Sequence, residues 1–275
     1  MPLPPGSVNL LNPPRLDKAA VRKSFNRCAD DYDRLAALQA EVLARLLERL
    51  DWVRLQPRHV LDLGCGTGQA IPALQKRYRG ARVIALDLAE RMLAHARRRY
   101  GLLGRKWLLN ADFEALPIRD GSIDLLFSSL ALQWSNDLPA VLRELRRVGR
   151  EGGLLQFTTL GVDTLKELRA AWAAVDDRPH VHGFPDLHDI GDMMVGAGLR
   201  EPVVDVETIT LEYRRFADLL RDLKGIGATN ADVGRGRGLL TPGRLRALES
   251  AYREQGFADG RYRASYEVVY GHAWF

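Results

Sequence analysis

Residues 60–68 read Val-Leu-Asp-Leu-Gly-Cys-Gly-Thr-Gly, and this stretch decides the fold. An apolar run typical of a buried strand leads into three alternate glycines, Gly64, Gly66 and Gly68, and an amphipathic segment follows. Glycines in such a loop permit a positive φ and let backbone N–H groups approach a ligand where a Cβ would collide. A dinucleotide fold needs the spacing G-x-G-x-x-G, but the residue three after Gly66 is Gln69. The loop therefore predicts a cofactor site and disfavours a nicotinamide dinucleotide.

Acidic side chains follow the next strand-like runs, at the points where these runs end. Asp87 follows the run 81–86, in a position where a carboxylate can accept both hydroxyl hydrogens of a ribose. Asp112 and Phe113 follow the third run, and they offer an acceptor for an adenine amino group and an aromatic face for its ring. A fourth run occupies residues 122–129. This alternation of strands and helices predicts an α/β fold built on a parallel sheet.

The chain of 275 residues is 46% hydrophobic, which suits one large α/β domain with insertions better than two independent domains. No segment has the apolar length of a membrane span or the pattern of a signal peptide, so we expect a cytoplasmic protein without a membrane partner. The expected organisation is a disordered lead (1–16), an N-terminal helical lid (17–57), a cofactor-binding core (58–160) and a helical cap with completing strands (161–275).

The net charge of +5 and the isoelectric point near 9.3 favour an acidic partner. No basic run is interleaved with stacking aromatic residues, so nucleic acid is not favoured as that partner. The two cysteines, Cys28 and Cys65, lie far apart in the sequence and predict neither a disulfide framework nor a cysteine zinc site.

The second half of the chain has more helical segments than the core fold needs. We expect these helices to pack over the carboxyl ends of the parallel strands, where ligands bind in open α/β sheets. A fifth strand at 154–159 is expected after a turn at Gly152 and Gly153. The remaining predicted elements are helices at 164–175, 187–196, 216–226 and 242–255, and strands at 203–213 and 262–275.

The glycine loop, the ribose acid and the adenine-side acid together resemble the class I S-adenosylmethionine-dependent methyltransferases, in which these motifs fall in the same order. This resemblance implies a Rossmann-like methyltransferase sheet with helices on both faces and S-adenosylmethionine as the cofactor. Cys65 then lies in the loop with its backbone toward the cofactor, which is a simpler interpretation than a nucleophile.

Further segments resemble one family within that class, the malonyl-acyl-carrier-protein O-methyltransferases of biotin synthesis. The similarity covers about residues 20–275 and includes the variable cap. One departure is the stretch 148–153, where the family has an apolar-Lys-Pro-Gly turn. The stretches that carry the resemblance are 25–29 with Tyr32 and Asp33, 130–134, 157–160, 165–169, 171–172, 180–184, 187–190, 222–230 and 266–270.

The resemblance implies transfer of a methyl group from S-adenosylmethionine to the free carboxylate of a malonyl thioester, carried by acyl carrier protein or by coenzyme A. Two alternatives stay open from the sequence. One is a C-methyltransferase of quinone type, which would need a base for its carbon acid. The other is a relative of the complex I assembly factor that hydroxylates arginine, or a relative that does not methylate.

The predicted site residues fall into three groups, and no metal ligand is among them. The catalytic group is Tyr32, Gln133 and Trp134. The substrate-binding group is His182 and Lys224. The cofactor-binding group is Asp62, Gly64, Cys65, Gly66, Gly68, Asp87, Leu88, Met92, Asp112, Phe113, Ser129 and Gln39.

Several of these residues have a plain structural alternative. Tyr32 and Gln39 lie seven residues apart, which would place them on one face of a helical lid, but Tyr32 could equally be a core contact. Trp134 is either a pocket wall or a core anchor, and Lys224 could be an exposed lysine at a helix end. The histidines of 180–188 could suggest a metal site, but their spacing matches no known metal motif, and we expect His188 and Asp189 to cap the next helix.

Overall fold

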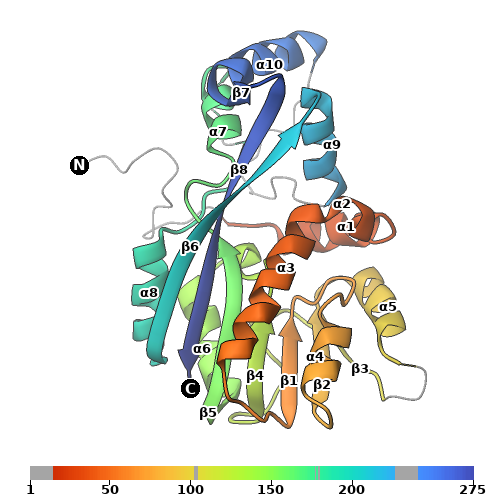
Figure 1. The fold of residues 1–275 in the computed structure, drawn as a ribbon, viewed down its shortest axis with the longest axis vertical. Helices are drawn as coiled ribbons and strands as arrows, with labels where there is room; N and C mark the ends of the chain where they lie inside the picture. The colour runs from red at the N-terminus through yellow and green to blue at the C-terminus, as the bar shows by residue number, and fades with distance from the viewer. Residues whose placement is uncertain (1–14, 102–104, 177, 179, 227–240) are drawn as a thin grey trace.

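The computed structural model describes residues 15–101, 105–176, 178, 180–226 and 241–275. In these residues the strands form one sheet in the order β3-β2-β1-β4-β5-β8-β6, and the short β7 pairs with β8 (Figure 1). β1 to β5 run parallel, whereas β8 is antiparallel to β5 and β6. The strands are β1 His59–Leu63, β2 Arg82–Asp87, β3 Trp107–Asn110, β4 Ile123–Ser128, β5 Gly149–Leu160, β6 Arg200–Tyr213, β7 Phe257–Ala258 and β8 Arg261–Trp274.

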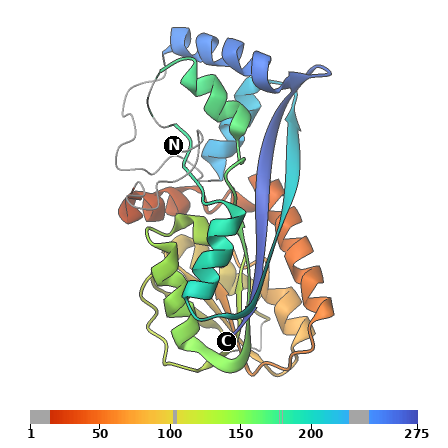
Figure 2. The ribbon, with the colours of Figure 1, turned by 90° about the vertical axis from the view of Figure 1, so that its left-hand side faces the viewer.

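Helices cover both faces of the sheet, as predicted, and Figure 2 shows the two layers edge-on. The apolar sides of α3 and α4 pack on one face, and those of α6 and α8 pack on the other. The central strands are buried on both faces, so neighbouring residues such as Val60 and Leu61 belong to opposite halves of the core. The helices are α1 Lys18–Cys28, α2 Tyr32–Leu35, α3 Ala37–Arg49, α4 Ile71–Arg77, α5 Glu90–Arg99, α6 Leu138–Val148, α7 Lys166–Ala173, α8 Leu187–Gly196, α9 Phe216–Gly225 and α10 Pro242–Gly256.

The predicted N-terminal lid consists of the helices α1, α2 and α3, followed by a 3-10 helix, Leu50–Trp52. Asp17 caps α1 by accepting a hydrogen bond from the N–H of Ala20, and Ala36 interrupts the helix between α2 and α3 with φ −85° and ψ 48°. Residues 1–14 of the predicted lead lie outside the described residues. Leu16, which we expected in that lead, is instead buried and donates its N–H to Asn136 Oδ1 at 2.7 Å.

The prediction for the start of the fifth strand was also wrong. Gly152 and Gly153 lie inside β5 rather than in a turn before it, because the strand begins at Gly149. The register with β4 shifts between Ile123 and Leu125, so β5 is irregular here. Gly152 takes up the irregularity with φ +75°, a value that suits glycine.

The cap is built on the two long strands β6 and β8. The lower halves of these strands complete the sheet, and their upper halves extend beyond it, where α7, α9 and α10 pack around them (Figure 1). The cap therefore lies beyond the carboxyl ends of the parallel strands. Within the described residues, no helix is both long enough and apolar enough to cross a membrane.

Candidate active site

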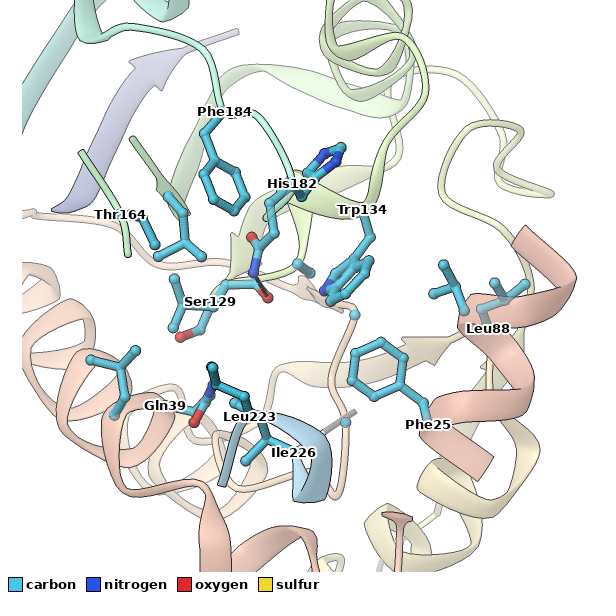
Figure 3. Close-up of a pocket in the computed structure, with 18 of the residues that line it drawn as sticks. Phe25, Gln39, Leu88, Ser129, Trp134, Thr164, His182, Phe184, Leu223 and Ile226 are labelled. Atoms are coloured by element: carbon cyan, nitrogen blue, oxygen red, sulfur yellow. Dashed lines mark hydrogen bonds between the residues drawn. The ribbon is translucent and has the colours of Figure 1, made fainter. Parts of the chain in front are cut away.

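One cavity lies at the carboxyl ends of the parallel strands, between the core, the N-terminal helices and the cap (Figure 3). A smaller cavity adjoins it at the glycine loop, and Tyr32, Gln39, Gly64, Gly66 and Ser129 line both. Predicted residues that line only the main cavity are Asp87, Leu88, Met92, Asp112, Phe113, Gln133, Trp134 and His182, while Asp62 and Cys65 line only the smaller one.

The glycine loop follows β1 and needs its glycines for two different reasons. Gly64 has φ +68°, and a Cβ there would lie 2.3 Å from the Cβ of Ala131, so the loop passes close to the chain after β4. Gly68 lines neither cavity. A Cβ on Gly68 would lie 2.6 Å from Ile71 and 2.8 Å from Ala96, so this glycine allows α4 and α5 to pack closely.

Asp87 lies at the end of β2 and holds the glycine loop from the side. Its carboxylate accepts hydrogen bonds from the N–H of Gly66 at 2.9 Å and from the N–H of Ala89 at 2.8 Å. Burial raises the pKa of Asp87 to about 6, although these bonds lower it. The carboxylate has further lone pairs toward the cavity, so it can still accept from a ligand.

Asp62 is a buried carboxyl group on β1 beside the glycine loop. It is 3% exposed, and within the described chain its Oδ2 has no hydrogen-bond partner. Burial, with a smaller effect of Asp87, raises the pKa of Asp62 to about 7. Burial also raises the pKa of the Cys65 thiol well above its usual value, which leaves Cys65 a poor nucleophile.

At the end of the cavity next to β3, two acidic side chains pair with a lysine of the first helix. Lys18 of α1 places its Nζ 3.1 Å from Asp112 Oδ1, 2.8 Å from Glu114 Oε1 and 4.6 Å from the centre of the Phe113 ring. Asp112, predicted as an adenine acceptor, thus also holds α1 in place. No local pattern marks Lys18 as a site residue, since its partners lie more than 90 residues away in the chain.

The lid meets the core through an aromatic contact and a carboxylate. Phe25 packs edge-on against Trp134 with ring centroids 5.3 Å apart, and both side chains face the cavity (Figure 3). Asp33 accepts hydrogen bonds from Thr67 Oγ1 and from Gln69 Nε2 at 2.8 Å in the glycine loop. Although burial opposes ionisation, these bonds and Arg99 hold the pKa of Asp33 below its usual value. In the sequence Asp33 belongs to a stretch that carries the family resemblance, but it was not among the predicted site residues.

Tyr32 and Gln39 both reach the cavity, but not for the reason predicted. They lie on two helices separated at Ala36 rather than on one helical face. Burial raises the pKa of Tyr32 above its usual value, so its phenol stays protonated at neutral pH.

The cap supplies the apolar half of the cavity from Leu165, Leu168, Phe184, Leu223 and Ile226. Two nonglycine residues in the cavity wall, Leu130 and Leu165, have φ near +50°. Such strain is kept only where the surroundings enforce it, and it is common at functional sites.

The remaining predicted residues near the cap have separate environments. Lys224 is exposed on α9 and is not among the lining residues, whereas its neighbour Leu223 is. The rest of the family-like stretch, 227–230, lies outside the described residues. His180 stacks on Trp172 with centroids 3.6 Å apart, and His182 packs edge-on against Phe184.

The helix that follows the histidines, α8, begins with a different capping residue than expected. The cap of α8 is Asp186, which accepts a hydrogen bond from the N–H of His188, so our expectation of His188 and Asp189 as caps was wrong. Within the part of the chain that the structure describes, no three metal-ligating side chains come together.

Comparison with known proteins agrees with this fold. Residues 61–157 match the methyltransferase domain family. The YcgJ protein from Bacillus subtilis has a similar structure, with a TM-score of 0.60 and 16% identity over 86% of this chain and 98% of that one. Haemonchus contortus phosphoethanolamine N-methyltransferase 2, solved in complex with S-adenosyl-L-methionine, has a TM-score of 0.54 and 20% identity over 84% of this chain and 51% of that one. The fold is that of the Rossmann-like methyltransferases.

The sequence relatives define the family more closely. The malonyl-[acyl-carrier protein] O-methyltransferase of Halorhodospira halophila is 54% identical over 260 residues, covering 94% of this chain and 88% of the relative. The chain belongs to the malonyl-[acyl-carrier protein] O-methyltransferase family.

Proposed function

We propose that this protein methylates the free carboxylate of a malonyl thioester on acyl carrier protein, with S-adenosylmethionine as the methyl donor. The observation that carries the proposal is that the main cavity joins Gly66 and Asp87 at one end to the apolar side chains of the cap at the other. A cofactor and an acyl chain can therefore meet in one space, and family membership gives the substrate class.

The residues at the glycine loop fit S-adenosylmethionine. Asp62 has a buried oxygen with no hydrogen-bond partner among the described residues, which suits the ammonium group of the methionine part. Asp87 can accept the ribose hydroxyls, and Asp112 and Phe113 can hold the adenine. Donors on the ligand would thus meet acceptors on the protein at each of these positions.

When bound, S-adenosylmethionine supplies a methyl group on a sulfonium; a C–O bond forms to the substrate, and the C–S electron pair returns to sulfur. A malonyl carboxyl group has a pKa of roughly 3 to 4, so it is already an anion at neutral pH and needs no general base. The protein's part is to orient this carboxylate and exclude water. The neutral hydroxyl group of Tyr32 can donate a hydrogen bond to this carboxylate, and the packed rings of Phe25 and Trp134 form the cavity wall that excludes water.

The test is turnover with radiolabelled S-adenosylmethionine and three acceptors: malonyl acyl carrier protein, malonyl-CoA and free malonate. We expect base-labile label on the malonyl thioesters, with the carrier protein preferred because the chain is basic. That preference should shrink as salt rises from about 50 to 300 mM, since screening weakens attraction between surface charges. Label on none of the three acceptors would contradict the proposal, and base-stable label would favour C-methylation.

A further inference from the structure

The C-terminal turn of α9 forms one wall of the main cavity in its apolar half. Leu223 and Ile226 line the cavity there, and Figure 3 shows both side chains at this end of the helix. Gly225 lies between them in the sequence and belongs to the stretch 222–230, which carries part of the family resemblance. Gly225 itself is not among the described lining residues, so any role it has in the site is indirect.

Gly225 allows α9 to approach the lid closely. Its backbone has an ordinary helical conformation without a positive φ, so the turn itself does not require glycine. A Cβ at this position would lie 2.3 Å from Leu35 Cδ1 and 3.5 Å from Leu35 Cγ. Leu35 of α2 therefore packs directly on the backbone of α9, and a side chain at position 225 would hold the two helices further apart.

The lid side of this contact is fixed to the core. Leu35 is the last residue of α2, and Asp33 lies on the same short helix. The carboxylate of Asp33 accepts hydrogen bonds from Gln69 Nε2 in the glycine loop at 2.8 Å and from Arg99 of α5 at 2.5 Å. Leu35 therefore limits how closely the end of α9 can approach, and its own position is set by the cofactor end of the site.

The two ends of α9 pack against different parts of the protein. Near its start, Phe216 is buried, and its ring packs against Tyr252 and Tyr262 of the cap with centroids 5.0 and 5.6 Å apart. Near its end, Gly225 contacts the lid through Leu35. A thicker contact at that end would tilt α9 away from the lid and would carry the cavity wall with it.

The wall across the cavity is held on β8 by hydrogen bonds. Thr164 lies across the cavity from Leu223 (Figure 3). Next to Thr164, Leu165 donates its N–H to Ser265 O at 2.6 Å, and the buried carboxylate of Glu167 accepts from the N–H of Ser265 at 3.2 Å. Because this wall is fixed, the room between the two walls depends on the position of α9.

We propose that the contact between Leu35 and Gly225 limits the size of the acyl group that the cavity accepts, and so selects a short dicarboxylic acyl thioester. This inference rests on the proposed function, because it takes the apolar half of the cavity as the place of the acyl chain. Leu35 and Gly225 are positioning residues in this account. They keep Leu223 and Ile226 close to the opposite wall, where extra methylene groups of a longer acyl chain would collide with them.

The test compares the malonyl and glutaryl thioesters of acyl carrier protein, which differ by two methylene groups, with saturating radiolabelled S-adenosylmethionine. In Gly225→Val the branched side chain meets Leu35 and should move the end of α9 outward. We expect the ratio of the two kcat/KM values, glutaryl over malonyl, to rise about 5- to 15-fold, the range that burial of two methylene groups supplies. General damage to the fold would lower both kcat/KM values and leave their ratio unchanged.

Three further variants separate this contact from other effects. Leu35→Phe enlarges the same contact from the lid side and should raise the ratio in the same direction, whether or not Gly225→Val folds. Adding Leu35→Ala to Gly225→Val removes the collision and should return the ratio to within about 2-fold of its value in the unaltered protein. The matched control is Gly196→Val, because Gly196 is likewise the last residue of its helix, α8, but a Cβ there would meet no atom within 4 Å. It should leave the ratio unchanged.

An unchanged ratio in the folded Gly225→Val and Leu35→Phe proteins would overturn the proposal, and so would an equal rise in Gly196→Val. An unaltered protein that methylates neither thioester would instead contradict the proposed function, so the two failures are distinguishable.

Discussion

The replacement Asp62→Asn should make the ligand-free protein more stable at neutral pH while removing its affinity for the cofactor. Asp62 is buried, and its pKa is raised from 3.8 to about 7. A difference of about three units corresponds to about 4 kcal/mol at 1.36 kcal/mol per unit. Part of this energy comes from the charge of Asp87, which a cavity water can screen. We therefore expect a gain of about 2–4 kcal/mol in the free energy of unfolding at pH 8.

The sign of the effect follows from proton binding. Below about pH 4 the carboxyl group of Asp62 is protonated in the folded and in the unfolded protein, so folding buries no charge at this position. Between pH 4 and 7 the folded state keeps a proton that the unfolded state has lost, so the stability of the unaltered protein falls as pH rises through this window. The asparagine side chain of the variant does not ionise. The advantage of the variant should grow from near zero at about pH 4 to its full value above about pH 7.

Urea unfolding of both proteins without cofactor, at pH 4.5 and pH 8, measures this difference. The matched control is Asp124→Asn. Asp124 is also buried, but its Oδ2 accepts from the N–H groups of Arg58 and His59 at 2.9 and 2.8 Å, and it pairs with Arg150, so its replacement should destabilise the protein. An Asp62→Asn protein that is less stable at pH 8, or equally altered at both pH values, would refute the reasoning.

Four further outcomes are expected. Asp33→Ala should lower the free energy of unfolding in urea by about 1–3 kcal/mol, because donors of the glycine loop lose their acceptor. Gly64→Ala should abolish cofactor binding in calorimetry, because the new methyl group would lie 2.3 Å from Ala131. Asp87→Ala should weaken the binding of S-adenosylmethionine by about 2–4 kcal/mol in the same assay. Unchanged affinity in a folded variant would exclude this acid as the ribose acceptor. The dissociation constant for S-adenosylmethionine should rise about tenfold per pH unit below 7, since Asp62 must ionise to hold the ammonium group of this ligand. The single-turnover rate of methylation with saturating cofactor should stay nearly flat from about pH 6 to 9.

Most of the core was predictable because local pattern and tertiary burial agree there. The strand before the glycine loop, the loop itself and the acid at the end of β2 are each marked by a continuous apolar run that ends in residues with a turn or ligand role. The helix at 187–196 was predicted with the bounds that the structure has, because its apolar face is regular. These elements carry their own signal within about ten residues.

The errors occur where distant parts of the chain decide the local structure. The break at Ala36 has no glycine or proline to mark it, and it allows Asp33 to reach the glycine loop from α2. The same limit applies to Lys18 and Asp62. The sequence shows that each side chain can carry a charge, but it does not show whether a partner of opposite charge lies opposite. Packing across the sheet decides both outcomes: Lys18 forms an ion pair, and one oxygen of Asp62 has no partner within the described chain.

The long strands β6 and β8 have a mechanical consequence. In each, one continuous strand of 14 residues belongs to the sheet at one end and to the cap at the other. The part of the cavity made by the cap is thus tied to the cofactor end by a ribbon that resists stretching, not by a hinge. Transplanting the cap from a relative to alter the acyl substrate would have to cut through this ribbon, whereas exchanging α9 alone would leave the spacing between donor and acceptor intact.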